Sequence, residues 1–322
     1  MSPAQRPSTR TAGVAGLLLS GWRVGISVSE SPDMERLGFG GMHLEDAIVE
    51  FARFLLANGA ALAYGGDLRV RGFSKMLFQV AEAHNRASGS SHRERIADFL
   101  AWPLHLKKKL PDSERAKWMQ SACFHDVPLP RDLKVARNTY LEPDSPENSY
   151  VWARCLTAMR EEMNHHIDAR VLLGGKVSGF RGKYPGIAEE GYLALRDGFP
   201  LYPAGGFGGC AKAVTGALLR RRPEVFSDIF QFKNREYAAM VGVYNDRATS
   251  PAGAGLEPVD YGGLRRFFEK KGVAGLNNGL STAENKRLFE TIHVPEMIAL
   301  VLKGLRSLDR KKAGRIQKRG RG

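Results

Sequence analysis

The chain has 322 residues and a mass of 35.5 kDa, enough for one large domain or two small ones with a sizeable core. Its apolar content of 43% and charged content of 25% are ordinary for a globular protein and argue against a disordered or fibrous chain. The formal net charge is +14, and residues 310–322 contribute seven Lys or Arg and no acid. We therefore predict a disordered basic tail over residues 307–322.

The sequence favours a cytoplasmic protein without a membrane partner. Three cysteines form neither a CxxC pair nor a metal spacing, which is typical of a reducing compartment. No stretch approaches the roughly 18 apolar residues that cross a bilayer. Residues 1–20 form an N-terminal extension, in which Arg6 and Arg10 precede a short apolar run. A secretory signal is the minor alternative, because no convincing cleavage site follows that run.

The first third of the chain predicts strands that alternate with helices. Residues 23–29 are β-branched and bounded by small residues, which indicates a buried strand. Residues 43–59 form a helix that ends at Gly59, with apolar side chains at helical spacing: Leu44, Ile48, Phe51 and Leu55. Strands are predicted at residues 60–64 and 96–104, and Ser74 is predicted to cap the helix between them.

The alternation continues to about residue 219. Ser145 and Pro146 start a helix over residues 145–167, with Ser145 as cap. Further strands are expected at residues 123–129, 169–173 and 200–204, with helices from Pro185 and from about Gly209. This order predicts an α/β fold, a Rossmann-like parallel sheet with helices on both faces. We place this domain at residues 21–220, and residues 221–306 form a helical C-terminal cap packed on it.

Loops rich in glycine or small residues follow four of the predicted strands, the first of them being "SVSES" at residues 27–31. In parallel sheets, ligands bind beyond the carboxyl ends of the strands, and the free N–H groups that start the next helices favour anions. The candidate ligand-binding residues are Ser27, Ser29, Gly65, Gly66, Arg71, Gly174, Gly175, Lys176, Arg181, Lys183, Gly186, Gly205, Gly206, Gly208 and Gly209. We expect the cations to neutralise phosphate charge. A solvated basic loop is the simpler alternative.

Glu189 and Glu190 are the candidate catalytic residues. Adjacent helical residues point about 100° apart, so we expect only one of the two carboxylates to face a pocket. This geometry disfavours a glycosidase that uses two facing carboxylates. The alternative role is to complement the dipole at the start of the helix, which is worth about 0.3–1 kcal/mol per carboxylate.

Several common motifs are absent or incomplete. "RGKY" is not a phosphate-binding Walker A loop, because no glycine lies five residues before Gly182 and no Ser or Thr follows Lys183. Gly206, Gly208 and Ala211 satisfy GxGxxA, but no acid follows at the spacing of a dehydrogenase. Glu162 and His165 form a single ExxH, whereas a di-iron bundle needs two. We predict neither a metal site nor a bound cofactor.

Three segments together resemble the SLOG superfamily: "YGGDLRVRGF", "GGKVSGFRGKYPGIAEE" and "PLYPAGGFGG". These Rossmann-like proteins include the "lonely guy" phosphoribohydrolases, DNA-processing proteins and nucleotide-sensing domains of bacterial conflict systems. The resemblance spans about residues 21–219 and points to a prokaryotic branch. The later "GLNNGLSTAENKRLF" also looks like part of that branch, which implies that the helical cap belongs to the family's architecture.

The resemblance is incomplete at the phosphate loop. The phosphoribohydrolases have "PGGxGTxxE", in which glycines and threonine hold phosphate and the glutamate serves the ribose. Gly174 and Gly175 match the glycine pair loosely, Gly186 follows an inserted basic loop, and no threonine is present. Glu189 or Glu190 matches the glutamate. The resemblance therefore implies a nucleotide pocket more strongly than it implies hydrolysis.

The sequence leaves three functions open. The first is the binding of a nucleotide or NAD-derived ligand by a sensor or processor in a prokaryotic signalling or defence system. The second is a nucleoside-phosphate N-glycosidase, and the third is nucleic-acid binding through the basic tail. A homo-oligomer is also an open alternative.

Overall fold

A computed structural model describes residues 17–66, 68, 72–89, 95–107, 111–250 and 255–319, with side chains described as far as residue 308. Arg71, one of the predicted ligand-binding residues, lies outside these ranges.

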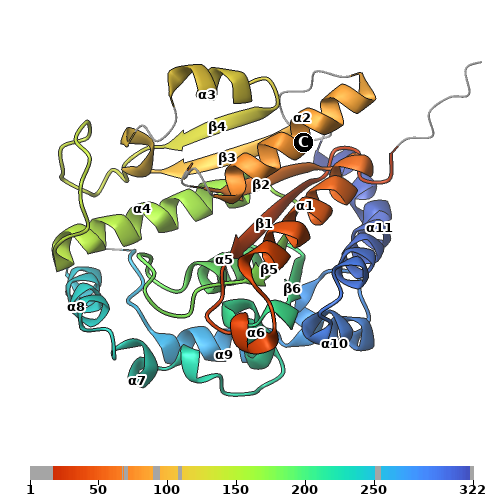
Figure 1. Cartoon of the computed structure of the whole chain (residues 1–322). Coiled ribbons are helices and arrows are strands. Elements are labelled where there is room, and N and C mark those ends of the chain that lie inside the picture. Colours follow the sequence, from red (N-terminus) through yellow and green to blue (C-terminus); the bar gives the residue numbers. More distant parts are fainter. Residues whose placement is uncertain are drawn as a thin grey trace, which may run out of the picture.

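Six parallel strands form one sheet at the centre of the molecule (Figure 1). The strands are β1 (Arg23–Ser29), β2 (Ala61–Gly65), β3 (Ile96–Ala101), β4 (Ala122–Val127), β5 (Ala169–Gly174) and β6 (Leu201–Ala204). Their order across the sheet is β4-β3-β2-β1-β5-β6. The chain thus adds β2, β3 and β4 in turn on one side of β1. It then crosses to the other side of β1 and adds β5 and β6. The predicted α/β fold is confirmed.

Helices cover both faces of the sheet. One face packs against α1 (Gly41–Ala57) and α2 (Phe73–Ser88), and the other packs against α4 (Pro146–His165), α5 (Gly186–Arg196) and α6 (Gly209–Leu218). Successive side chains of β5 point to opposite faces of the sheet, and both faces are apolar. Val171 and Leu173 join the apolar cluster of α1 and α2, while Leu172 joins that of α5 and α6. A sheet buried on both faces has nearly continuous apolar strands, as this chain has.

Of the two predicted helix caps, Ser145 is confirmed and Ser74 is wrong. Ser145 accepts a hydrogen bond from the Asn148 N–H at 3.2 Å and starts α4 as predicted. Ser74, in contrast, is not a cap, because α2 begins at Phe73 after Gly72. The Ser74 hydroxyl instead donates to Oδ1 of Asp98 at 3.2 Å. Asp98 is a fully buried residue of β3, so a tertiary partner overrides the local preference.

The C-terminal helices extend around the β6 edge of the sheet. They are α7 (Asp228–Gln231), α8 (Arg235–Thr249), α9 (Tyr261–Lys271), α10 (Thr282–Glu290) and α11 (Val294–Arg319), while the short α3 (Asp112–Trp118) lies between β3 and β4 in the chain. Helices α8 and α9 pack against α4, α5 and α6, α10 packs on β6, and α11 packs on α1. Among the described residues, no helix is long and apolar enough to span a membrane.

Two features of this region concern the predicted tail and the "GLNNGLSTAEN" segment. Helix α11 continues to Arg319, so the backbone is helical where we predicted disorder. Lys, Arg, Ala and Gln favour helix, and extending an existing helix avoids the cost of nucleation. Asn278 of "GLNNGLSTAEN" is buried, with 1% of its surface exposed, and its side-chain amide donates to the carbonyl of Leu201 at 2.8 Å. It therefore satisfies part of the open edge of β6.

Candidate functional site

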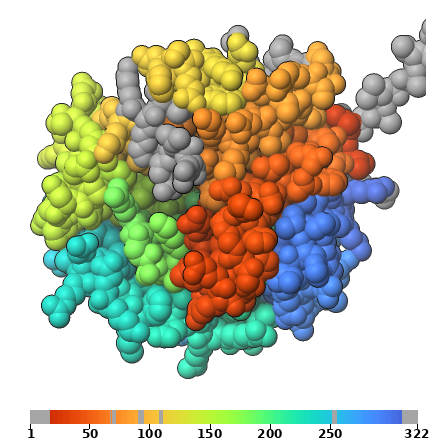
Figure 2. Space-filling view, viewed as in Figure 1, coloured from red at the N-terminus to blue at the C-terminus, as the bar shows by residue number. Residues whose placement is uncertain are grey.

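A cavity of about 560 Å³ lies at the carboxyl edge of the sheet. It is located where β1 and β5 diverge, with Ser29 opposite Gly174 in the parallel register. The strand order reverses at this point, which is where ligands bind in open α/β sheets. Figure 2 shows the green loop of residues 175–183 at the surface, between the red segment that follows β1 and the yellow-green segment that leads into α4. The fold therefore places a pocket where the sequence predicts one.

Eight of the predicted residues line this cavity. They are Ser27, Ser29, Gly65, Gly66, Lys176, Arg181, Gly186 and Glu190. The first four end β1 and β2, and the others come from the loop after β5 and the start of α5. The parallel sheet explains this convergence, because the loops after neighbouring parallel strands meet at one edge.

Gly174 and Gly175 have a structural role beside the cavity. Both adopt positive φ angles, +60° and +109°, which L side chains rarely adopt. A Cβ at Gly174 would lie 2.6 Å from the carbonyl oxygen of Ser29. The Gly175 N–H donates to that same oxygen at 2.8 Å, and the Gly175 carbonyl accepts from Cys210 N–H at 3.0 Å. The glycine pair thus fastens β5 to β1 and to the start of α6.

The loop after β6 is covered by the C-terminal helices. A Cβ at Gly205 would lie 2.3 Å from the carbonyl oxygen of Phe289, and one at Gly206 would lie 2.0 Å from that of Thr291. Because Gly205 and Gly206 have no side chain, the end of α10 and the residue that follows it can pack directly against them. Neither glycine lines the cavity. The reason is positional: β6 is an edge strand, and α10 packs directly on it.

The N-terminus of α6 is occupied by a side chain of the protein itself. Gly208 and Gly209 have positive φ angles, and the Gly209 N–H donates to Oδ2 of Asp33 at 2.9 Å. Burial acts to raise the pKa of Asp33, but the hydrogen bonds from Gly209 and Arg36 outweigh it and hold that pKa below its ordinary value. A carboxylate already takes the position that an anionic ligand would use at this helix.

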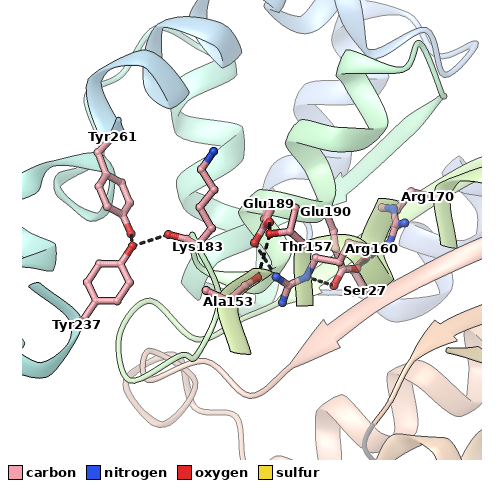
Figure 3. Close-up of polar contacts among 10 residues, drawn as sticks. All are labelled: Ser27, Ala153, Thr157, Arg160, Arg170, Lys183, Glu189, Glu190, Tyr237 and Tyr261. Atoms are coloured by element: carbon pink, nitrogen blue, oxygen red, sulfur yellow. Dashed lines mark hydrogen bonds and ion pairs between the residues drawn. The ribbon is translucent and has the colours of Figure 1, made fainter. Parts of the chain in front are cut away.

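The two glutamates of α5 point to different sides, as the helical geometry predicts. Glu190 lines the cavity, and its Oε2 accepts from Nη1 of Arg170 at 2.6 Å and from the Ser27 hydroxyl (Figure 3). Arg170 is fully buried and also donates to Ser27 Oγ at 2.9 Å and to Asn164 Oδ1 at 2.7 Å. Burial lowers the pKa of Arg170, and Glu190 opposes that shift.

Glu189 is buried on the other side of α5 and is 2% exposed. Its carboxylate accepts from the Thr157 hydroxyl and from Nη1 of Arg160 at 2.6 Å (Figure 3). It borders a separate small cavity of about 150 Å³. Glu189 therefore does not line the main cavity, and Glu190 is the only glutamate of α5 that does.

Arg160 is a cavity residue that the sequence analysis missed. Its Nη1 binds Glu189, and its Nε lies 3.5 Å from Oε1 of Glu190, so one guanidinium joins the two carboxylates. Two glycines make room for it, because a Cβ at Gly182 or Gly186 would lie 2.8 Å from an Arg160 nitrogen. The signal in the sequence was an arginine at helical spacing among the buried apolar residues of α4.

An aromatic wall faces the loop after β5 and was also missed. Trp152 of α4 lines the cavity together with Tyr140, Phe180 and Tyr64. The Trp152 and Tyr140 rings meet edge to face, with centroids 6.1 Å apart. Arg181 places its guanidinium 5.0 Å from the centre of the Trp152 ring. Tyr140 belongs to a long polar connection that has no periodic apolar pattern, so its position in the cavity was not predictable.

Lys183 does not reach the main cavity. It is 7% exposed, and its Nζ donates to the carbonyl of Glu257 at 2.9 Å. Its carbonyl accepts from the Tyr237 hydroxyl at 2.5 Å (Figure 3). Burial lowers the pKa of Lys183, although the nearby Glu189 and Glu257 oppose the shift. Lys183 borders the same small cavity as Glu189, so it is remote from a ligand in the main one.

The parallel sheet, its switch point and the cavity define a Rossmann-like α/β protein. Residues 18–288 match the family described as SLOG cluster2, and the chain belongs to that family. This confirms the superfamily that the sequence resembles and indicates a nucleotide-related function. The match extends into α10, so it includes much of the helical C-terminal region. No curated protein matches the chain.

Proposed function

We propose that the main cavity binds a nucleotide or NAD-derived ligand, and that the protein senses or processes it in a prokaryotic signalling or defence system. The observation that carries this proposal is the contrast between two helix N-termini at the same sheet edge. That of α6 is occupied by Asp33, whereas the N-cap residue of α5, Pro185, makes no side-chain cap hydrogen bond, and Gly186 and Ile187 line the cavity. The N–H groups of Gly186 and Ile187 are therefore offered to a phosphate, while that of Ala188 is bound to Cys210.

Cations and a hydrogen-bond acceptor complete the site for such a ligand. Lys176 and Arg181 are exposed on the loop that precedes α5 and line the same cavity. They neutralise phosphate charge, and arginine adds the geometry of a bidentate fork. Glu190 is held by Arg170 and Ser27 through its Oε2, and its Oε1, whose only partner among the described residues is Arg160 Nε at 3.5 Å, has a lone pair to accept a ribose hydroxyl.

Thermal melting with a panel of ligands tests the proposal. The panel comprises nucleoside monophosphates, NAD and ADP-ribose, with inorganic phosphate as the control for charge alone. At least one nucleotide should raise the melting temperature in a concentration-dependent way, because a ligand that binds only the folded state stabilises it. If the whole panel leaves the melting temperature unchanged at millimolar concentration, the proposal fails.

A second candidate is a nucleoside-phosphate N-glycosidase, and the position of Glu190 favours it. A carboxylate beside the ribose stabilises the positive charge that develops at C1′ as the bond to the base breaks and water adds. The buried Glu189 cannot act as a second facing carboxylate, so the two-carboxylate mechanism does not apply. Chromatography after incubation with the same panel detects released base.

Two variants separate hydrolysis from sensing. Under the hydrolase hypothesis, Glu190→Gln abolishes base release while the protein still melts cooperatively. Glu161→Gln, at a half-exposed residue of α4 that does not line the main cavity, serves as the control and keeps full activity. Stabilisation by a nucleotide without any release of base in the wild type would instead identify a sensor.

A further inference from the structure

Trp152 is held rigidly in the wall of the cavity. Its indole N–H donates to the carbonyl of Leu141 at 2.7 Å, and its edge contacts Tyr140. The residue is only 2% exposed. Arg181 lies over its face, with the guanidinium 5.0 Å from the ring centre. The Trp152 ring therefore borders the cavity, with the Arg181 guanidinium lying over it.

That covering side chain is weakly held. Arg181 is exposed and belongs to the loop between β5 and α5. Within the described part of the chain it forms no ion pair, and cation–π contacts at exposed sites are weak. Arg181 can thus leave the Trp152 ring at low cost when a phosphate offers it a charged partner.

A second cation covers a second ring but is tethered. Lys107 lies 4.4 Å from the centre of the Tyr140 ring, and its Nζ is 3.3 Å from Oε1 of Glu142. Arg181 has no comparable carboxylate partner among the residues that the structure describes. Of the two covered rings, Trp152 is therefore the one whose face is readily exposed.

We propose that Trp152 is the platform for the base of the ligand, and that Arg181 covers it only while the cavity is empty. On binding, the base takes the position of the guanidinium on the indole ring, and Arg181 turns to the phosphate at the start of α5. This rests on the proposed function and deepens it, because it selects ligands that carry both an aromatic base and a phosphate. Stacking is tolerant of base identity, so the platform accepts purines readily.

Tryptophan fluorescence of the full chain tests the exchange, with AMP and ADP-ribose as probes and ribose 5-phosphate as the control without a base. AMP or ADP-ribose should change the emission by stacking on Trp152, whereas ribose 5-phosphate, which can only draw Arg181 off the ring, should change it no further than Arg181→Ala does. The nucleotide should also bind about tenfold or more tightly than ribose 5-phosphate, the magnitude expected for one stacked base.

Two variants assign the signal. Trp152→Phe should remove the change in emission, whereas Trp118→Phe, in the apolar cluster on the opposite face of the sheet, should preserve it. Arg181→Ala leaves the Trp152 face bare, so it should alter the emission of the free protein and weaken ribose 5-phosphate binding. Because Arg181 is exposed, this variant tests the exchange even if Trp152→Phe fails to fold.

The outcomes separate this inference from the proposed function. If AMP, ADP-ribose and ribose 5-phosphate bind equally well and Trp152 emission stays constant, the base platform is wrong while the phosphate site survives. If a nucleotide binds tightly but Arg181→Ala leaves both the emission of the free protein and the affinity unchanged, the exchange is wrong. If none of the three ligands binds, the proposed function fails and this inference fails with it.

Discussion

Arg170, a fully buried residue of β5, donates from its Nη1 to Oε2 of Glu190 on α5 at a distance of 2.6 Å. This ion pair joins the centre of the sheet to the wall of the cavity. It fixes the direction of Glu190, the α5 glutamate that lines the cavity, and the Ser27 hydroxyl of β1 donates to the same carboxylate oxygen.

We expect Arg170→Met to lower the free energy of unfolding by about 3–5 kcal/mol, because removing one partner leaves the other charge poorly compensated in the interior. Urea unfolding measures the change. Arg36→Met is the control, since the Arg36 side chain is 80% exposed in its ion pair and should contribute less than about 1 kcal/mol. Equal effects of the two substitutions would show that the buried pair is not a structural link.

Gly206→Ala should disturb the contact between the β6 loop and the C-terminal helices. The added Cβ would lie 2.0 Å from the carbonyl oxygen of Thr291, so the backbone has to move. We expect a loss of about 1–3 kcal/mol, the usual cost of overpacking. Gly242→Ala in α8 is the matched control, because nothing lies within 4 Å of its Cβ position. That substitution should stabilise by about 0.5–1 kcal/mol through helix propensity, and a loss there would contradict the packing argument.

Asp33→Ala should remove the carboxylate from the start of α6 and cost about 0.5–2 kcal/mol near neutral pH. The pKa of Asp33 is lower in the folded protein than its ordinary value of 3.8. Its contribution is therefore fully present above pH about 4 and is lost as the pH falls through the lowered pKa. Denaturant unfolding of both proteins from pH 7 to pH 2.5 should show their stabilities converging at the acid end. A gap that stays constant over this range would refute the role of the charge.

The basic tail carries its own prediction. If residues 310–322 bind nucleic acid, the affinity of the full chain for DNA should fall steeply with salt, and removal of these residues should abolish it. Fluorescence anisotropy with a labelled duplex measures both effects. Binding that is insensitive to salt, or that survives the truncation, would rule out the tail as the contact.

Local sequence patterns were sufficient to predict the helices and strands, and to predict that Glu189 and Glu190 point to different sides of α5. Ser145 and Pro146 marked the start of α4, and the β-branched and apolar runs marked the strands. The 100° separation of adjacent helical residues placed Glu189 and Glu190 on different sides of α5. Each of these inferences depends on neighbours in the sequence, which is why it succeeded.

Contacts between distant segments were not predictable in the same way. Gly206 resembles a ligand loop locally, but Thr291 covers it from 85 residues further along the chain. Ser74 resembles a helix cap, but its hydroxyl donates a hydrogen bond to Asp98 of β3. Arg160 resembles an exposed helical cation until Gly182 and Gly186 are seen to make space for it. In each case the contacting residue is distant in the sequence, and only the tertiary fold brings the two together.

The most direct test of the central claim is calorimetric titration of ADP-ribose and AMP into three proteins: the wild type, the Lys176→Ala/Arg181→Ala variant, and an Arg222→Ala/Lys233→Ala control with the same change of charge at exposed positions outside the cavity. We predict that the wild type and the control bind at least one of the two ligands with equal affinity, and that the cavity variant loses tenfold or more of that affinity. Equal binding by all three proteins, or the absence of binding to the wild type, would contradict a nucleotide site in this cavity.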